Sequence, residues 1–199
     1  MVTHPSILLI EDSPGERELF RLALVQTGLD VALFAEQDAE AAFRFLEDQC
    51  SFQARSGSSS EGGLNWSPTA RTLSPAQPQA RQDAPFPEGA HSDRAASASK
   101  RDQSGYPLPS LILLDLHLGG QNGCDFLKRL RTDARFASIP ALVFTTSDDT
   151  SDLSLAYANG ANGYVVKPGT FAELIQCTSD ICRYWMDRNR TPHMVATRC

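Results

Sequence analysis

The sequence predicts an α/β protein in which five parallel strands alternate with five helices, so that helices cover both faces of one sheet. Continuous apolar runs, SILLI at 6–10 and LILL within 111–115, are typical of strands buried on both faces. Segments with helical spacing of apolar residues separate such runs. This alternation is the pattern of a doubly wound parallel sheet, and a chain of 199 residues suffices for one such domain.

The first two strand–helix units lie before residue 50. After the strand at 6–10, Ser13 is placed to cap a helix that has Pro14 in its first turn and ends at Gly28. The helical spacing of this segment is marked by Leu19, Leu22, Ala23 and Gln26. A second strand at 31–36 precedes a helix at 38–49. The inward residues of this helix are either Ala41, Phe45 and Leu46 or Ala42, Phe43 and Leu46.

Residues 51–109 differ in composition from the rest of the chain. They are rich in Ser, Pro, Gly, Ala and Gln and lack apolar periodicity, so they cannot bury enough surface to offset the ordering of their backbone. We predict a disordered insertion between the second helix and the third strand, within a single domain at 1–190. The insertion is either a partner-binding or protease-sensitive arm or an expansion without a function. The flanking fold tolerates it because the free energy of loop closure grows slowly with length.

Three further units follow the insertion. Strands are expected at 111–115, 140–146 and 163–167, and helices at 122–133, 148–160 and 170–188. The last helix carries a long apolar stripe, which consists of Phe171, Leu174, Ile175, Thr178, Ile181, Cys182 and Trp185. The stripe is longer than one face of a small sheet needs, so we expect Trp185 to contact a second copy of the chain or another protein. The alternative is that Trp185 belongs to the core.

Composition excludes several classes of protein. The net charge of −6 argues against a general nucleic-acid-binding protein, which has a basic surface. No apolar run is long enough to span a bilayer, and the N-terminus lacks the basic region of a secretory signal. The five cysteines are scattered and form no C-x-x-C pair, which indicates reduced thiols rather than disulfides or a zinc site. We therefore expect a cytoplasmic protein.

Charged and hydroxyl side chains follow four of the predicted strands. Glu11 and Asp12 follow the first strand, Asp115 ends the third, and Thr145 and Lys167 end the fourth and fifth. The carboxyl ends of parallel strands form the site of an open α/β sheet, so these groups should converge. Crowded carboxylates favour a hard divalent cation, and Mg²⁺ uses carboxylates together with phosphate oxygens. The pattern predicts a site for Mg²⁺ and a phosphoryl group, with Lys167 and Thr145 bound to phosphoryl oxygens.

Four segments, ILLIEDSPGERE, LILLDLHLGGQNG, ALVFTTSDD and GANGYVVKP, together resemble the receiver domain of two-component response regulators. The resemblance covers about 6–188 apart from the insertion and implies a flavodoxin-like (βα)5 fold. It further implies that Asp115 accepts a phosphoryl group from a histidine kinase. Mg²⁺ would then be held by Glu11, Asp12, Asp115 and the backbone carbonyl of His117.

The same resemblance assigns the remaining site residues. Lys167 matches the lysine that contacts the phosphoryl group, and Pro168 matches the proline after it, which usually follows a cis bond. Thr145 matches the switch hydroxyl and Tyr164 the aromatic switch residue. After phosphorylation Thr145 would follow the phosphoryl oxygens and Tyr164 would fill the space it leaves. This would change the face formed by the fourth helix, fifth strand and fifth helix.

Finer features resemble single-domain regulators paired with phytochrome kinases. These are EDSPGE, the Thr-Thr-Ser-Asp stretch, and Tyr184 with Trp185 near the chain's end. Residues 191–199 look like a short tail, so we expect no DNA-binding output domain and no direct contact with nucleic acid or membrane. The regulator would signal through protein contacts, as a homodimer formed through the fifth helix.

Two positions depart from the family pattern. The family usually has Asn two residues after the acceptor and Pro four residues after it, where this chain has His117 and Gly119. The His117 carbonyl can still serve the metal, while its side chain would face the phosphoryl group and affect how long that group persists. Gly119 and Gly120 would loosen a loop that Pro stiffens.

Two other functions fit part of the pattern. An aspartyl-phosphate phosphatase of the haloacid dehalogenase type also uses an Asp at a strand end, but it needs a second Asp where His117 stands. A scaffold that has lost signalling would share the fold, yet Asp12, Asp115, Thr145 and Lys167 are all present. We therefore expect a phosphoacceptor rather than an enzyme. Such a protein catalyses only its own phosphorylation and dephosphorylation.

Overall fold

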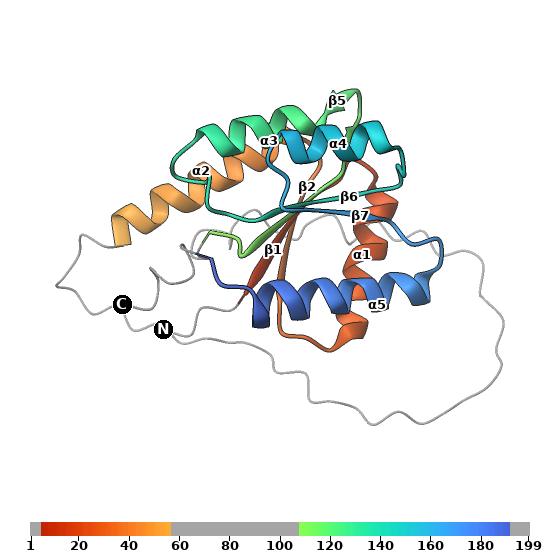
Figure 1. Cartoon of the computed structure of the whole chain (residues 1–199). Helices are drawn as coiled ribbons and strands as arrows, with labels where there is room; N and C mark the ends of the chain where they lie inside the picture. The colour runs from red at the N-terminus through yellow and green to blue at the C-terminus, as the bar shows by residue number, and fades with distance from the viewer. Residues whose placement is uncertain (1–4, 57–107, 192–199) are drawn as a thin grey trace, which may run out of the picture.

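A five-stranded parallel sheet in the order β2-β1-β3-β6-β7 forms the centre of the molecule, as the computed structural model shows (Figure 1). The structure describes residues 5–56 and 108–191. The strands are β1 (Ser6–Ile10), β2 (Ala32–Glu36), β3 (Leu111–Leu114), β6 (Ala141–Thr145) and β7 (Gly163–Val166). All four pairings are parallel. This confirms the predicted flavodoxin-like doubly wound sheet.

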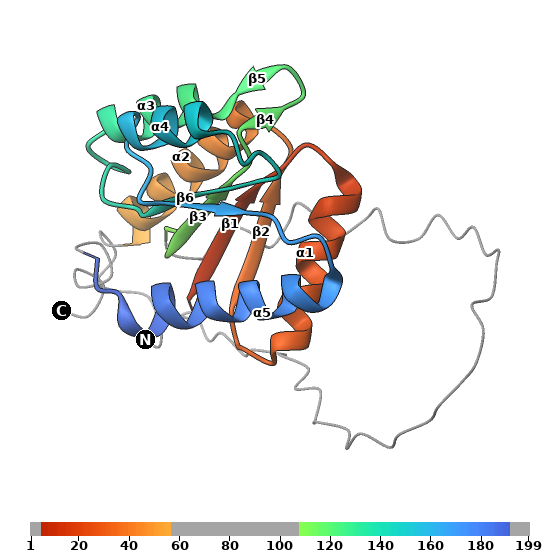
Figure 2. The ribbon, with the colours of Figure 1, turned by 45° about the vertical axis from the view of Figure 1, so that its right-hand side comes forward.

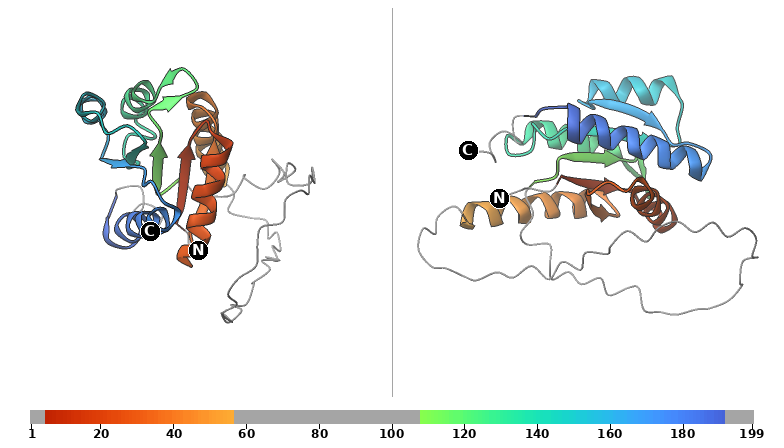
Figure 3. Two further views of the ribbon diagram at one scale, coloured as in Figure 1. Left: turned by 90° about the vertical axis from the view of Figure 1, so that its right-hand side faces the viewer. Right: turned by 90° about the horizontal axis from the view of Figure 1, so that it is seen from below.

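Helices cover both faces of the sheet. They are α1 (Pro14–Thr27), α2 (Ala39–Ser56), α3 (Gly123–Thr132), α4 (Thr150–Ala158), α5 (Phe171–Cys182) and the short π-helix η1 (Arg183–Arg188). Helices α1 and α5 lie together on one face, and α2, α3 and α4 lie on the other (Figures 1 and 3). Consequently the sheet separates two apolar cores, and alternate residues of β1 and β3 point into each.

Helix α1 starts and ends as its sequence predicts, but its buried face differs from the spacing noted above. The Ser13 side chain accepts a hydrogen bond from Glu16 N–H, and Gly28 ends the helix with a φ of 68°. The buried residues are Phe20, Ala23 and Leu24, whereas Leu19 is 47% exposed and Leu22 39% exposed. Phe20 decides the orientation because its ring packs edge-on against Phe144 of β6, at 5.7 Å between centroids.

Helix α2 is longer than the predicted 38–49. It continues to Ser56, so its last turns occupy the start of the segment predicted as a disordered insertion. At the other end of that segment Pro109 is buried beside β3. The prediction for residues 57–107 lies outside the described residues. The buried residues of α2 include Ala42, Phe43 and Leu46, which are the second predicted set. Phe45, from the first predicted set, is buried as well.

The apolar stripe of the fifth helix packs inward on the sheet. Thr178 and Ile181 are buried in the core that α1 shares, and Trp185 is partly buried against the same core. After Cys182 the helix continues as the π-helix η1, which the pattern for 170–188 did not distinguish. Packing within one chain therefore explains most of the stripe, whereas Phe171 at its start is 42% exposed. Tyr184, in contrast, is 56% exposed.

A short hairpin, β4 (His117–Leu118) with β5 (Gln121–Asn122), follows β3 and was not predicted. Gly119 and Gly120 form its two-residue turn, and both have positive φ, 52° and 93°. Positive φ at both central positions is the geometry of the tight turns that suit hairpins, and proline cannot adopt it. The expected loose loop is thus a defined hairpin, which projects beyond the sheet (Figure 2). Among the described helices, none is long and apolar enough to cross a membrane.

Candidate functional site

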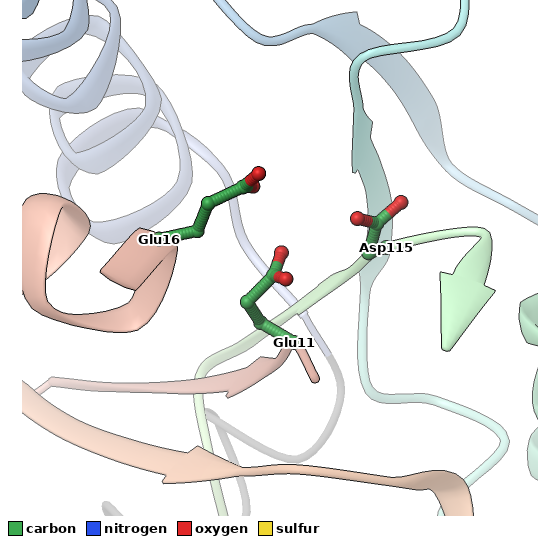
Figure 4. Close-up of side chains that lie close together, drawn as sticks. All are labelled: Glu11, Glu16 and Asp115. Atoms are coloured by element: carbon green, nitrogen blue, oxygen red, sulfur yellow. The ribbon is translucent and has the colours of Figure 1, made fainter. Parts of the chain in front are cut away.

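The carboxyl edge of the sheet brings Glu11 and Asp115, two of the predicted acidic residues, together with Lys167. Glu11 directly follows β1 and Asp115 directly follows β3 (Figure 4). Their backbones are still held in the sheet, because Asp115 N–H donates to the Ile10 carbonyl at 3.0 Å and Glu11 N–H to that of Glu36 at 3.0 Å. Lys167 N–H donates to the Thr145 carbonyl at 2.7 Å. Sheet pairing therefore fixes the position of each group.

Lys167 lies at the centre of three carboxylates. Its ammonium donates to Glu11 Oε2 at 2.6 Å, to Asp115 Oδ2 at 2.9 Å and to a carboxylate oxygen of Glu16. The side chains of Lys167 and Asp115 are each only 10% exposed. Three carboxylates around one ammonium leave two negative charges unbalanced in a mostly buried place. These charges can attract a further cation.

Asp115 remains ionised in this environment. Burial alone would raise its pKa, but the hydrogen bond and charge of Lys167 outweigh burial, and the pKa lies below the ordinary value. The Thr145 hydroxyl and the His117 N–H, at 3.3 Å, also donate to the carboxylate. An ionised carboxylate with an oxygen close to the protein surface is a nucleophile at neutral pH.

Glu11 and Lys167 respond to burial in different ways. Burial raises the pKa of Glu11, although Lys167 and the Ser13 N–H favour its charged form. Burial alone would lower the pKa of Lys167, but its hydrogen bonds to Glu11, Glu16 and Asp115 raise the pKa above the ordinary value. Lys167 is therefore always protonated, whereas ionised Glu11 is held at a cost in free energy.

A close backbone contact also fixes the loop that follows Asp115. Gly123 N–H donates to the Leu116 carbonyl at 2.9 Å, and a Cβ on Gly123 would lie 2.5 Å from the Asp115 carbonyl oxygen. Asn122 caps α3 through its side chain, which accepts a hydrogen bond from Cys124 N–H. The hairpin that carries His117 is therefore held between the sheet and α3.

The acidic groups that lie closest together are not the set predicted for the metal. Oxygens of Glu11, Glu16 and Asp115 lie within 4.8 Å of one another (Figure 4). Asp12 is exposed and outside this group; its carboxylate lies toward the hairpin, where a Cβ on Gly119 would be 3.5 Å from it. Glu16 was not predicted because an acidic residue in the first turn of a helix is commonly a partner of the helix dipole.

Arg17 is a second residue that sequence reasoning missed. Its guanidinium donates to the backbone carbonyls of Glu11 and Asp12, the latter at 3.0 Å. These contacts hold the turn between β1 and α1 and place a positive charge behind the acidic pair. The only sequence signal is an arginine one helical turn after Ser13, a spacing common on any helix.

The chemistry of the oxygen donors fits a divalent cation. Hard cations such as Mg²⁺ are bound by one or two carboxylates, carbonyl oxygens and water. Glu11 and Asp115 supply carboxylates with unbalanced charge, Asp12 follows Glu11 at the same edge, and the His117 backbone N–H contacts Asp115. The residues present therefore suit such an ion.

Of the predicted switch residues, Thr145 ends β6, the strand next to β3, and Tyr164 lies on β7, the strand beyond it. Thr145 is fully buried, and its hydroxyl accepts a hydrogen bond from Ser147 N–H at 3.4 Å. The Tyr164 hydroxyl donates to the Ser147 carbonyl at 3.0 Å, and burial raises its pKa. Both side chains thus contact the same loop after β6. The bond before Pro168 is trans, contrary to the cis bond that the resemblance implied.

Comparisons with known proteins give a consistent match. The sequence model of the family described as the response regulator receiver domain matches residues 89–179. Response regulator Rcp1 of Synechocystis is 31% identical over 101 residues, which are 49% of this chain and 69% of Rcp1. A probable methanogenesis regulatory protein, FilR2 of Methanothrix harundinacea, is 39% identical over 88 residues, or 44% of this chain. The matched segment spans only 57% of the length of FilR2.

Solved structures share the fold. The phosphorylated cyanobacterial phytochrome response regulator RcpA has a TM-score of 0.62 at 22% identity, covering 96% of this chain and 99% of RcpA. The Mn²⁺-bound form of Rcp1 has a TM-score of 0.60 at 22% identity, covering 94% of this chain and 99% of Rcp1.

Proposed function

Because the chain belongs to the receiver domain family of response regulators, we propose that Asp115 accepts a phosphoryl group from the phosphohistidine of a histidine kinase. The observation that carries the proposal is the convergence of Lys167 with Glu11 and Asp115 at the carboxyl edge of the sheet. In this reaction the bond between phosphorus and the imidazole nitrogen breaks while the Asp115 oxygen bonds to phosphorus. The leaving imidazole takes up a proton.

Each side chain has a role that follows from its position. Asp115 is ionised, so it attacks without first losing a proton. Lys167 lies 2.9 Å from Asp115 Oδ2 and can neutralise charge on the transferred group. A bound divalent cation supplies further charge neutralisation. We propose that the chain catalyses only its own phosphorylation and dephosphorylation and acts on no other substrate.

We assign the divalent cation to Glu11, Asp12, Asp115 and the backbone carbonyl of His117. The negative charge around Lys167 supports this assignment, and the relative Rcp1 has been solved with Mn²⁺ bound. We propose Mg²⁺ as the ion because it favours carboxylates together with phosphate oxygens. The His117 side chain is exposed beside the acceptor, where we expect it to influence the lifetime of the phosphoryl group.

The response to phosphorylation is proposed to begin at the loop after β6. Thr145 would turn to the phosphoryl oxygens, which would break the hydrogen bond that its hydroxyl accepts from Ser147 N–H. Tyr164 donates to the Ser147 carbonyl and would move with this loop. The change would reach α4, because the Ser147 hydroxyl donates to Asp152 of α4 at 2.7 Å. Phosphorylation would thereby favour one of two arrangements of the α4–β7–α5 face.

The relatives and the surface support the partners that we propose. RcpA is a phytochrome response regulator, which supports a phytochrome-type histidine kinase as the phosphodonor. We propose that the two proteins meet in the cytoplasm. The net charge of −6 favours signalling through proteins rather than nucleic acid. We further propose that the chain dimerises through α5. A groove of about 500 Å³ beside β7 is lined by Val165, Cys177, Tyr184 and Trp185 among others, and Tyr184 is 56% exposed.

The proposal is tested by labelling with a small phosphodonor. We expect incubation with phosphoramidate and Mg²⁺ to add one phosphoryl group, detected by intact mass, and chelation of Mg²⁺ to prevent it. Asp115→Asn should remain unlabelled because the nucleophilic oxygen is lost. Asp125→Asn is the matched control, because Asp125 is 77% exposed and pairs with Lys128 on α3. Undiminished labelling of Asp115→Asn would refute the assignment of the acceptor.

A further inference from the structure

Glu16 is a third carboxylate on Lys167, and it comes from a different kind of element than the other two. Glu11 and Asp115 directly follow strands, whereas Glu16 lies in the first turn of α1 (Figure 4). Its side chain is 41% exposed, against 3% for Glu11 and 10% for Asp115. Among the described residues its carboxylate accepts a hydrogen bond from Lys167 alone.

The ammonium group of Lys167 has three N–H donors, and the three carboxylates use all of them. Lys167 can therefore bind the oxygens of a phosphoryl group on Asp115 only if it gives up a present partner. The bond to Asp115 would pass to the phosphoryl group itself, but that group presents more than one new oxygen. A second bond from Lys167 to the phosphoryl group would need the donor that now serves Glu11 or Glu16.

Glu11 is the partner that stays. Its carboxylate is nearly fully buried, and its second oxygen accepts a hydrogen bond from Ser13 N–H at 3.0 Å. Water cannot easily replace Lys167 there, so an unpaired Glu11 would be a buried charge without compensation. Glu16 is half-exposed, and water can hydrate its carboxylate when Lys167 leaves.

The space beside Glu16 also permits the movement. Glu16 and Lys167 line a cavity of about 170 Å³ between α1 and α5, whose other walls include Leu19, Phe144 and Leu174. Glu11 lines the same cavity but is only 3% exposed, so of the two carboxylates Glu16, at 41% exposed, is the one that can turn toward solvent. The chain around Lys167, in contrast, is fixed by its hydrogen bond to the Thr145 carbonyl.

We propose that Glu16 holds Lys167 in the unphosphorylated site and must release it for the phosphorylated site to form. Glu16 is then a positioning residue that slows phosphoryl transfer and lowers the fraction of phosphorylated chain. The inference rests on the proposed function of Asp115 and adds a control of its rate. It separates Glu16 from the metal ligands, although its oxygens lie near those of Glu11 and Asp115.

The test compares Glu16→Gln with the parent chain and with Glu18→Gln. Glu18 lies on the same helix, is 54% exposed and pairs with Arg21, so its variant removes one charge without touching Lys167. With phosphoramidate and Mg²⁺ we expect Glu16→Gln to be labelled about threefold faster than the parent. The variant loses the partly exposed ion pair between Glu16 and Lys167, and such pairs contribute little free energy. Glu18→Gln should match the parent. Beryllofluoride with Mg²⁺ should bind more tightly to Glu16→Gln than to the parent, and fluorine NMR measures this binding.

The possible outcomes are distinguishable. One outcome is that the parent is labelled and that Glu16→Gln is labelled no faster than the parent or Glu18→Gln. This would refute the role of Glu16 while the proposed function stands. Slower labelling of Glu16→Gln with a higher Mg²⁺ requirement would assign Glu16 to the metal and also refute it. If the parent neither accepts a phosphoryl group nor binds beryllofluoride, the proposed function fails and the role of Glu16 fails with it.

Discussion

At the scale of single residues, the site is a balance between one ammonium and several carboxylates. Lys167 lowers the pKa of Asp115, but its attraction does not overcome the burial of Glu11. The two carboxylates therefore make opposite contributions to stability at neutral pH. Asp115 is favoured in its ionised form by the fold, whereas Glu11 is disfavoured in its ionised form until a cation binds beside it.

This difference predicts the effect of Glu11→Gln. The variant removes a buried charge and keeps the shape of the side chain, so in the presence of a chelator at pH 7 we expect its melting temperature to rise by roughly 2 to 4 °C, the shift that about 1 kcal/mol produces in a domain of this size. Its affinity for a divalent cation should fall at the same time. Circular dichroism and Mg²⁺ titration measure the two effects.

The pH dependence of the Glu11→Gln effect has a defined sign. The pKa of Glu11 is raised in the folded chain, so its stabilising contribution is complete below the ordinary value of 4.5 and is lost as pH rises through the folded value. The difference in melting temperature between variant and parent should thus close as pH falls toward 4.5. A difference that widens on acidification would contradict the burial of Glu11, and Asp125→Asn serves as the exposed control.

At the scale of elements, the hairpin β4–β5 and the start of α3 determine where the acceptor loop lies. Gly119 and Gly120 supply the positive φ values of the turn, while Gly123 allows α3 to approach the Asp115 carbonyl. The loop is held by backbone contacts rather than by the proline usual in the family. Backbone approach therefore accompanies the contact of His117 N–H with the Asp115 carboxylate at 3.3 Å.

Gly123→Ala tests this element. The new Cβ would lie 2.5 Å from the Asp115 carbonyl oxygen and 3.0 Å from Leu116 Cα, so the backbone has to move. We expect a loss of about 1–3 kcal/mol in the free energy of unfolding, measured with urea, together with slower phosphorylation. Gly169→Ala is the matched control because a Cβ there meets nothing within 4 Å. Equal stability of the two variants would show that the approach is not limiting.

At the scale of the whole molecule, parallel pairing of the strands turns residues far apart in the sequence into one site. Glu11 and Lys167 are separated by 156 residues, yet both stand at the carboxyl edge. The same architecture leaves β7 as an edge strand with α5 beside it, and Val166 of β7 is 45% exposed. The groove next to this edge is the surface proposed for a second copy of the chain.

Tyr184→Ala tests that dimer more directly than Trp185→Ala. Tyr184 is 56% exposed, so its removal should leave the fold intact, whereas Trp185 packs on the core and its removal would destabilise the monomer. We expect Tyr184→Ala to weaken dimerisation by about thirtyfold in Kd, measured by light scattering with and without phosphorylation. Tyr157→Ala, on exposed α4, is the control. A parent chain that stays monomeric at high concentration would rule out the dimer.

The sequence alone determined the alternation of strands and helices, the parallel sheet and the placement of Asp115, Thr145 and Lys167 at strand ends. These features depend on local patterns, because buried strands read as apolar runs and the carboxyl edge follows from parallel pairing. Caps such as Ser13 and Gly28 were also readable, because their chemistry is local.

Only the tertiary structure decided which groups touch and which faces are covered. Glu16 joins Lys167 because α1 starts above the carboxyl edge, while Asp12 turns toward the hairpin. The stripe of α5 meets the core because α1 packs against the same face of the sheet. Such contacts depend on the orientation of each helix on the sheet, which apolar spacing leaves open when several faces of a helix carry apolar residues.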